Sequence, residues 1–326
     1  MKKLLLVMLS VLLLASCGGK PVATVGDIKI TQSEFEFYLD SIKNQMSDTE
    51  LQTDEDWENK EIEGKKAIDV AKQQAMDNAV RNALYIEATE AAGLSLTEEE
   101  KKTVDATKQQ LVSGYGSDKA YKDFLNSNNI TDEFIEMMCK SSVYYNKIGQ
   151  IVTEETPVGD NELSAYFEEN KADFEREVRK AKHILIATMD PETNLPKSQE
   201  EQTKASLLSK EILDRVQNGE DFDALMREYS EDPGLTTNPD GYVFGTGEMV
   251  PEFEEATDSV GFGEIAFCKS SFGYHIIKRL PISYEDAKDT IRSEFFGKLI
   301  DEKVEKWKEE YSIEIKQNEE LLAEIK

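Results

Sequence analysis

The chain has 326 residues, enough for two domains that each bury a core of their own. Charged residues make up 32% of it and hydrophobic residues 39%, a composition typical of a soluble, helix-rich globular protein. With 38 Lys and Arg against 66 Asp and Glu the formal charge is −28, which argues against nucleic-acid binding and excludes membrane attachment by charge.

The first residues have the layout of a secretory signal peptide. Two lysines precede the apolar run Leu4–Leu14, which is too short to span a bilayer. The Leu-Ala-Ser-Cys segment that ends at Cys17 resembles the bacterial lipobox, and this implies cleavage before a diacylated cysteine. Two acyl chains suffice for stable anchoring. We expect a lipoprotein signal peptide over 1–16 and a lipidated Cys17 with a tether over 17–21; the alternative is an ordinary signal peptide with an incidental cysteine.

The next part of the chain is mostly helical in pattern. It opens with a strand-like hairpin over Val22–Ile30, and Thr31 with Glu34 forms a capping box that starts a helix. An acidic, polar stretch over 47–60 predicts a surface loop. Small apolar residues then recur every fourth position and predict one long helix over 62–92. Further helices are expected from Thr97 and over 118–127, 131–152 and 160–170.

The pattern changes near Arg179. Strand-like and helix-like segments follow in the order β-α-α-β-α-β-β, which indicates an α+β domain. The clearest strands are expected over 180–187, 264–269 and 273–279, and helices over 198–218, 221–229 and 251–258.

The C-terminal part is again helical. A long apolar stripe over Ser283–Tyr311 ends in an alternating strand, Ser312–Lys316. A helix this long needs a partner that covers its apolar side, so we expect it to return to the first helical region. Ile313–Ile315 should then lie beside Val22–Ile30. The expected domains are a discontinuous helical one over 22–177 and 282–326, and an α+β one over 178–281 inserted in it.

Histidine is scarce and concentrated in one unit. The chain has two, His183 and His275, each in a predicted strand of the α+β domain, which suggests a shared place. A packed core role remains the alternative for histidines in strands. Cys139 and Cys268 lie in different predicted domains, and we expect unpaired, buried side chains there, although export permits a disulfide. No CxxC or HxxxH spacing indicates a metal motif.

Four motifs of the α+β domain resemble, in the same order, those of the parvulin family of prolyl isomerases. They are Lys182-His183-Ile184-Leu185, Tyr229-Ser230-Glu231-Asp232-Pro233-Gly234, Gly247-Glu248-Met249-Val250-Pro251-Glu252-Phe253 and Phe272-Gly273-Tyr274-His275-Ile276-Ile277. The resemblance implies the α+β parvulin fold, a four-stranded antiparallel sheet with helices, inserted in a mostly helical chaperone-like domain. It also implies an enzyme without a cofactor or metal. A zinc site on His183, Asp232 and His275 is the alternative that the residue types leave open.

The same resemblance implies the active site. It makes His183, Asp232 and His275 a hydrogen-bonded catalytic cluster under the substrate proline, acting as a polar network and not as nucleophile and base. It makes Met249 and Phe253, with Phe272 nearby, the pocket for the proline ring. The residue types alone leave open that Asp232 is a turn residue and that the two pocket residues belong to the core.

One departure from the family pattern concerns the pocket wall. The family often has Leu three residues before the equivalent of Phe244, and this chain has Gly241 there. We expect Tyr242 to take over that part of the wall as a substrate-binding residue.

The whole layout resembles the PrsA foldase lipoproteins of Gram-positive bacteria. This implies an extracytoplasmic prolyl isomerase and foldase, held on the outer face of the plasma membrane by the lipid at Cys17. Its partners would be unfolded or partly folded exported proteins with X-Pro bonds. The alternative is a holdase chaperone whose parvulin domain is inactive and only binds clients. The oligomeric state stays open, and a homodimer through the helical domain is compatible with the resemblance.

Overall fold

The computed structural model describes residues 20–47, 51–190, 193 and 195–325. The predicted signal peptide, Cys17 and most of the tether lie outside these residues. No helix in the described part of the chain has the length and apolar character needed to cross a membrane. The chain divides into two compact units. The first comprises the residues up to Pro157 and those from Phe296 onward, and the second comprises Val158–Phe295.

The first unit contains a three-stranded sheet formed by segments from both ends of the chain. Strands β1 (Ala23–Val25) and β2 (Ile28–Ile30) form the expected hairpin. Strand β9 (Ile315–Gln317) pairs antiparallel with the other edge of β1, with Val25 opposite Ile315. The strand order is therefore β2-β1-β9, and the expectation that the C-terminal strand lies beside the first hairpin is confirmed.

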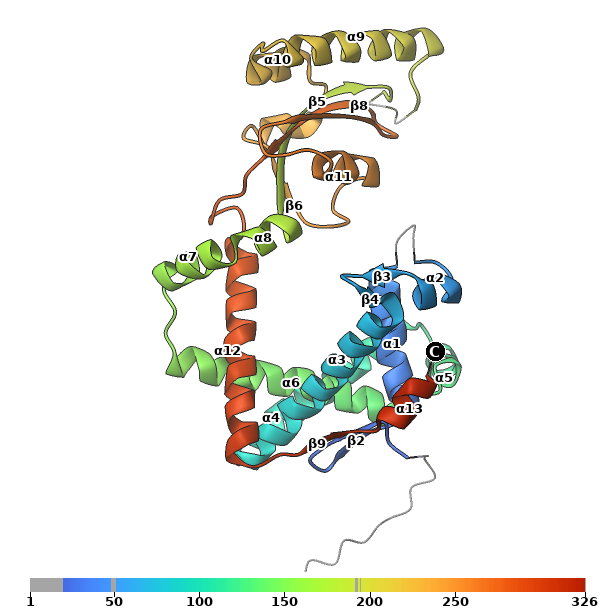
Figure 1. Cartoon of the computed structure of the whole chain (residues 1–326), viewed down its shortest axis with the longest axis vertical. Helices are drawn as coiled ribbons and strands as arrows, with labels where there is room; N and C mark the ends of the chain where they lie inside the picture. Colours follow the sequence, from blue (N-terminus) through green and yellow to red (C-terminus); the bar gives the residue numbers. More distant parts are fainter. Residues whose placement is uncertain (1–19, 48–50, 191–192, 194, 326) are drawn as a thin grey trace, which may run out of the picture. The chain divides into compact units, whose positions relative to one another are not determined.

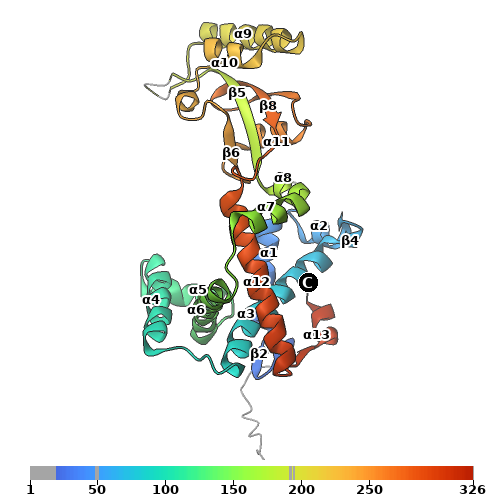
Figure 2. The same ribbon diagram turned by 90° about the vertical axis from the view of Figure 1, so that its left-hand side faces the viewer.

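The helices of the first unit share one hydrophobic core. They are α1 (Gln32–Met46), α2 (Asp54–Asn59), α3 (Ala67–Ala91), α4 (Glu98–Gly114), α5 (Asp118–Ser127), α6 (Asp132–Glu155), α13 (Glu319–Glu324) and the later part of α12 (Lys288–Glu310). Helix α3 lies against α1 and α6, and α4 lies beside α6 (Figure 2). The alanines of the predicted stripe on α3 are fully buried, and Ile300, Val304 and Trp307 of α12 join the same core. Because alanine side chains are small, the stripe lets the neighbouring helices α1 and α6 pack close to α3.

Two predictions for this unit are wrong. Helix α2 occupies part of the expected loop, because Thr53 and Asp56 form a capping box and the buried Trp57 anchors the helix to the core. The long helix starts later than residue 62, since a small hairpin of β3 (Glu61–Ile62) and β4 (Lys65–Lys66) precedes it.

The second unit contains the predicted α+β arrangement (Figure 1). Its elements are α7 (Asp160–Glu169), α8 (Lys171–Glu177), β5 (Arg179–Ala187), α9 (Gln199–Gln217), α10 (Phe222–Tyr229), β6 (Tyr242–Phe244), α11 (Pro251–Asp258), β7 (Ile265–Lys269), β8 (Gly273–Leu280) and the first turns of α12. The four strands form an antiparallel sheet in the order β6-β5-β8-β7. The predicted order of elements and the fold class are confirmed.

Different helices pack on the two faces of this sheet. Ile184, Ile186 and Ile276 point to the face that α9 and α10 cover, where they form one apolar cluster. Side chains alternate along a strand, so the neighbouring residues of β5 and β8 point to the opposite face. There Ala181 and Ile277 pack with Phe253 of α11. Both histidines lie on this second face, with their rings against Phe253 of α11.

The two cysteines in the described residues are unpaired, as expected. Cys139 is buried in α6 and Cys268 is half-buried in β7. Burial, with the charge of Glu252 adding to it, raises the pKa of the Cys268 thiol to about 11, so the side chain stays a neutral thiol.

Candidate active site

The two histidines meet because their strands are neighbours in the sheet. His275 stands opposite Leu185 in the β5–β8 register, two positions from His183 on the same face. The distance between the two Nδ1 atoms is 3.1 Å, and the rings are nearly parallel with an interplanar angle of 13°. Only 8% of His183 and 4% of His275 is exposed, so the pair is a buried polar contact inside a largely apolar unit.

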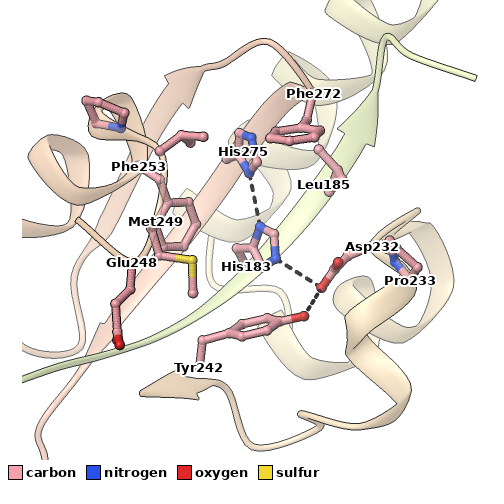
Figure 3. Close-up of a pocket in the computed structure, with 12 residues that line it drawn as sticks. His183, Leu185, Asp232, Pro233, Tyr242, Glu248, Met249, Phe253, Phe272 and His275 are labelled. Carbon is pink, nitrogen blue, oxygen red and sulfur yellow. Dashed lines mark hydrogen bonds and ion pairs between the residues drawn. The ribbon is translucent and has the colours of Figure 1, made fainter. Parts of the chain in front are cut away.

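Asp232 lies in the turn after α10, which places its side chain next to the histidine pair. Its side-chain Oδ1 accepts a hydrogen bond from the N–H of Gly234 at 3.1 Å, which fixes the carboxylate at the start of a short 3₁₀ turn, Pro233–Thr236. The other oxygen, Oδ2, lies 3.1 Å from Nε2 of His183. The hydroxyl of Tyr242 donates to the same Oδ2 at 2.6 Å. The structure therefore brings together the three residues of the predicted cluster (Figure 3).

Ser270 extends the cluster at its other end, and the sequence analysis missed it. Its Oγ lies 2.7 Å from Nε2 of His275 and accepts a hydrogen bond from the N–H of Phe272 at 3.1 Å. A lone serine in a turn between two strands carries no pattern that points to a site. Only the close approach of the β7–β8 turn to His275 shows its role.

The hydrogen bonds assign a consistent set of protons. An ionised Asp232 can only accept, so Nε2 of His183 donates to it, and with one proton on each imidazole Nδ1 of His183 accepts. That acceptor takes the Nδ1–H of His275, whose Nε2 then accepts from the hydroxyl of Ser270. The donors thus point in one direction, from the serine through both imidazoles to the carboxylate.

The pKa values agree with this assignment. Burial raises the pKa of Asp232, but the hydrogen bonds from His183 and Tyr242 outweigh it, and the net result is a pKa lowered to about 2. Burial and the neighbouring His183 lower the pKa of His275 to about 4, against the opposing effect of Asp232. At neutral pH the cluster therefore holds a charged carboxylate and a neutral His275.

A pocket of about 610 Å³ lies directly on the histidine pair. Its walls are mainly apolar and include Leu185, Met249, Phe253 and Phe272 (Figure 3). Phe253 is buried, and its ring lies nearly perpendicular to both imidazole rings, at centroid distances of 5.2 Å and 5.6 Å. Phe272 is 53% exposed and stands at the rim.

Each predicted substrate-binding residue lines this one pocket. Met249 and Val250 precede α11, and Pro251 starts that helix. Tyr242, which begins β6, forms the wall nearest Asp232, with its ring edge-on to His183 at 5.6 Å. Among the described residues, no group of three or more His, Cys, Asp or Glu side chains is arranged to hold a metal ion.

Comparison with known proteins gives two matching family profiles. The profile described as a PPIC-type PPIASE domain matches residues 165–280, and the profile described as a SurA-like N-terminal domain matches residues 3–149. The first match contains the whole cluster and its pocket. The second covers most of the first unit up to α6.

Relatives named foldase protein PrsA cover most of the chain. The foldase protein PrsA of Caldanaerobacter subterraneus subsp. tengcongensis is 32% identical over 86% of this chain and 83% of its own length. That of Clostridium tetani is 27% identical over 92% of this chain and 87% of its own length. A crystal structure of the PrsA peptidylprolyl isomerase from Bacillus anthracis is 23% identical and covers 74% of this chain and 99% of that one. The TM-score of that match is 0.27.

Proposed function

The chain belongs to the family of PrsA foldases, and from this premise we propose that the pocket on His183, Asp232 and His275 is where it isomerises X-Pro bonds. The protein is a peptidyl-prolyl cis/trans isomerase of the parvulin type and a foldase. The observation that carries the assignment of the site is the contact of an apolar pocket with a fully hydrogen-bonded polar cluster.

The reaction needs a site that favours a twisted peptide bond. The planar bond is protected by a rotational barrier of about 18–20 kcal/mol, and an uncatalysed X-Pro bond exchanges over roughly tens to hundreds of seconds. The twisted state loses amide resonance and with it part of the dipole that water solvates. A pocket that removes water from the bond therefore stabilises the twisted state relative to the planar one. Met249, Phe253 and Phe272 provide such walls for the proline ring.

The polar cluster adds a fixed electrostatic environment. Both carboxylate oxygens of Asp232 and every ring nitrogen of the two histidines have a hydrogen-bond partner within 3.1 Å. The groups are therefore oriented before a client enters, and no reorganisation is needed as the bond rotates. A carboxylate with three donors is a poor nucleophile and a poor base, so we assign the cluster an orienting and electrostatic role.

The two parts of the chain divide the work. We assign isomerisation to residues 178–281, and holding of unfolded clients to the helical part, residues 22–177 and 282–326. The match of residues 3–149 to a SurA-like N-terminal domain supports the second assignment.

The proposal is tested with a cis/trans assay on X-Pro peptides. We expect His183→Ala, Asp232→Ala and His275→Ala each to lower kcat/KM by about tenfold or more, because each leaves a buried partner without its hydrogen bond. Lys204→Ala, on the exposed side of α9, is the matched control and should keep the wild-type rate. Wild-type rates in all three cluster variants would reject the site. A wild-type chain that suppresses aggregation without accelerating exchange would point to a holdase.

We propose that Cys17 is diacylated and holds the chain on the outer face of the plasma membrane of a Gram-positive bacterium, where exported chains emerge unfolded. The lipobox-like sequence after a short apolar run supports this. Labelled palmitate should enter the wild-type chain in cells and should not enter Cys17→Ser, which should be released into the medium. Equal labelling of both chains would contradict the anchor.

A further inference from the structure

Tyr242 closes the acidic end of the histidine cluster. Its hydroxyl donates to Oδ2 of Asp232 at 2.6 Å, and this is the same oxygen that accepts from Nε2 of His183 at 3.1 Å. The phenol ring stands edge-on to His183, with an interplanar angle of 73°. The side chain therefore touches both the carboxylate and the imidazole that the carboxylate orients (Figure 3).

The backbone before Tyr242 leaves no room for a side chain at residue 241. Gly241 has a φ of +102°, and a Cβ atom there would lie 2.7 Å from the carbonyl oxygen of Ala181. The strand pairing puts Tyr242 opposite Ala181, so this approach is fixed by the sheet. The residue that walls this side of the pocket must therefore come from position 242.

A second glycine gives the phenol its access to Asp232. A Cβ atom at Gly234 would lie 2.0 Å from the hydroxyl oxygen of Tyr242. The N–H of the same glycine donates to Oδ1 of Asp232. The 3₁₀ turn thus holds the carboxylate from one side and leaves space for the tyrosine on the other.

We propose that Tyr242 is a positioning residue for the isomerase reaction, whose hydroxyl fixes the Asp232 carboxylate in the orientation that holds His183. This role is distinct from walling the pocket, which needs only the ring. It rests on the function proposed above for the cluster.

The physical reason lies in the freedom of an aspartate side chain. The terminal torsion of Asp is broad, so a carboxylate with fewer donors samples several orientations. Two donors on Oδ2 and one on Oδ1 define a single plane for Asp232. Burial, together with the neighbouring Asp232, raises the pKa of Tyr242 to about 12. The phenol therefore stays a donor throughout the physiological pH range.

Tyr242→Phe separates the hydroxyl from the ring. A hydrogen bond to a charged group typically contributes enough for a ten- to hundredfold effect, so we expect kcat to fall by about tenfold. The ring still walls the pocket, so KM should stay within about twofold of the wild-type value. A wild-type kcat in this variant would overturn the proposal and leave Tyr242 as a wall residue only.

Gly234→Ala provides an independent route to the same contact. The added methyl group displaces the phenol oxygen while the tyrosine itself is kept. We expect this change to lower kcat in the wild-type background and to add little in the Tyr242→Phe background, since the oxygen that it meets is then absent. An equal loss in both backgrounds would contradict the proposal.

Tyr284→Phe is the matched control. Tyr284 also donates from its hydroxyl to an aspartate, Asp160, at 3.2 Å, within the same unit and outside the pocket. The Tyr284→Phe variant should keep the wild-type kcat and KM. Thermal melting of all variants checks the fold. If the wild-type chain itself is inactive on X-Pro peptides, the proposed function fails; if it is active and Tyr242→Phe equals it, only this inference fails.

Discussion

With one proton on each imidazole, the polar cluster has a single proton arrangement that satisfies all its hydrogen bonds. His183 carries its proton on Nε2 and His275 on Nδ1, because the series of donors ends on the ionised Asp232. The two rings are therefore different tautomers although they lie 3.1 Å apart. This difference makes the cluster directional, with its negative end beside Tyr242.

The tautomers can be read by nitrogen NMR. The chain has only two histidines, so selective ¹⁵N labelling gives four ring signals. At pH 7 we expect a protonated Nε2 on His183 and a protonated Nδ1 on a neutral His275, and the pKa of His275 should lie near 4 because burial and His183 oppose its charge. Two rings of the same tautomer, or a His275 that titrates near 6.5, would contradict the hydrogen-bond assignment.

The depressed pKa of His275 also makes stability depend on pH. Its folded value of about 4 lies below the ordinary 6.5, so the unfolded chain binds the proton first as the pH falls. The stabilisation is complete above about pH 6.5 and is lost between there and about pH 4. At pH 4.5 the loss amounts to about 2.5 kcal/mol in the free energy of unfolding.

Denaturant unfolding at pH 7 and pH 4.5 checks this loss. Many carboxylates also titrate in the range, so the informative quantity is the difference between the wild-type chain and His275→Gln. We expect the variant to be less stable at pH 7 and to lose less on acidification. Equal losses in both chains would show that His275 does not control this pH dependence.

At the scale of single residues, the sequence and the fold contributed different parts of the site. The two histidines and Asp232 could be chosen from their motifs because those residue types carry chemistry. Ser270 could not, since its hydroxyl acts only where the β7–β8 turn brings it against His275. The hydrogen bond of Tyr242 was also unforeseen, because it depends on the space that Gly234 leaves.

At the scale of elements, helix starts were predicted well where side chains cap them. The capping boxes of Thr31 with Glu34 and of Thr97 with Glu100 form as expected at α1 and α4. A third box, Thr53 with Asp56, was overlooked because the surrounding acidic stretch favoured a loop. The β3–β4 hairpin has only two residues in each strand, too few for an alternation to be recognised.

The turn before β6 should tolerate no side chain. Gly241→Ala adds a Cβ atom 2.7 Å from the carbonyl oxygen of Ala181, in a backbone conformation that already disfavours alanine. We expect it to lower the free energy of unfolding of the second unit by about 3 kcal/mol. The measurement is denaturant unfolding followed by circular dichroism.

Gly219→Ala is the matched control for this change. Gly219 also has a positive φ, +89°, but no atom lies within 4 Å of the added methyl group. It should cost only about 1 kcal/mol, the conformational part. Equal effects at both positions would mean that the approach to Ala181 is not tight.

At the scale of the whole molecule, the first unit depends on a segment from the end of the chain. Strand β9 covers one edge of β1, and the N–H of Asn318 donates to the carbonyl oxygen of Val22 at 2.8 Å. Ile325 is buried in the same core. The return of the C-terminal segment to the first unit could be predicted, because an alternating strand follows a long helix whose apolar side needs a cover. The strand that forms, β9, pairs with β1 of the first hairpin, as expected.

Truncation after Glu310 tests this dependence. It removes β9 and α13 and exposes the edge of β1, so the first unit should unfold at a lower temperature. The pocket lies wholly within the second unit, and kcat/KM on short X-Pro peptides should stay close to the wild-type value. Calorimetry and the peptide assay on the same sample give both results. An unchanged melting profile, or equal loss of folding and activity, would contradict the separate roles.

The central claim is that a proline ring occupies the apolar pocket on the histidine pair while its peptide bond rotates. Among the described residues Met249 is the one methionine that lines this pocket, so ¹³C-methyl labelling of methionine gives it a direct reporter. One exchange spectrum of the labelled chain with an X-Pro peptide tests the claim. We predict cis/trans exchange peaks of the peptide together with contacts between the proline ring protons and the Met249 methyl group. Exchange peaks without any contact to Met249 would contradict the account.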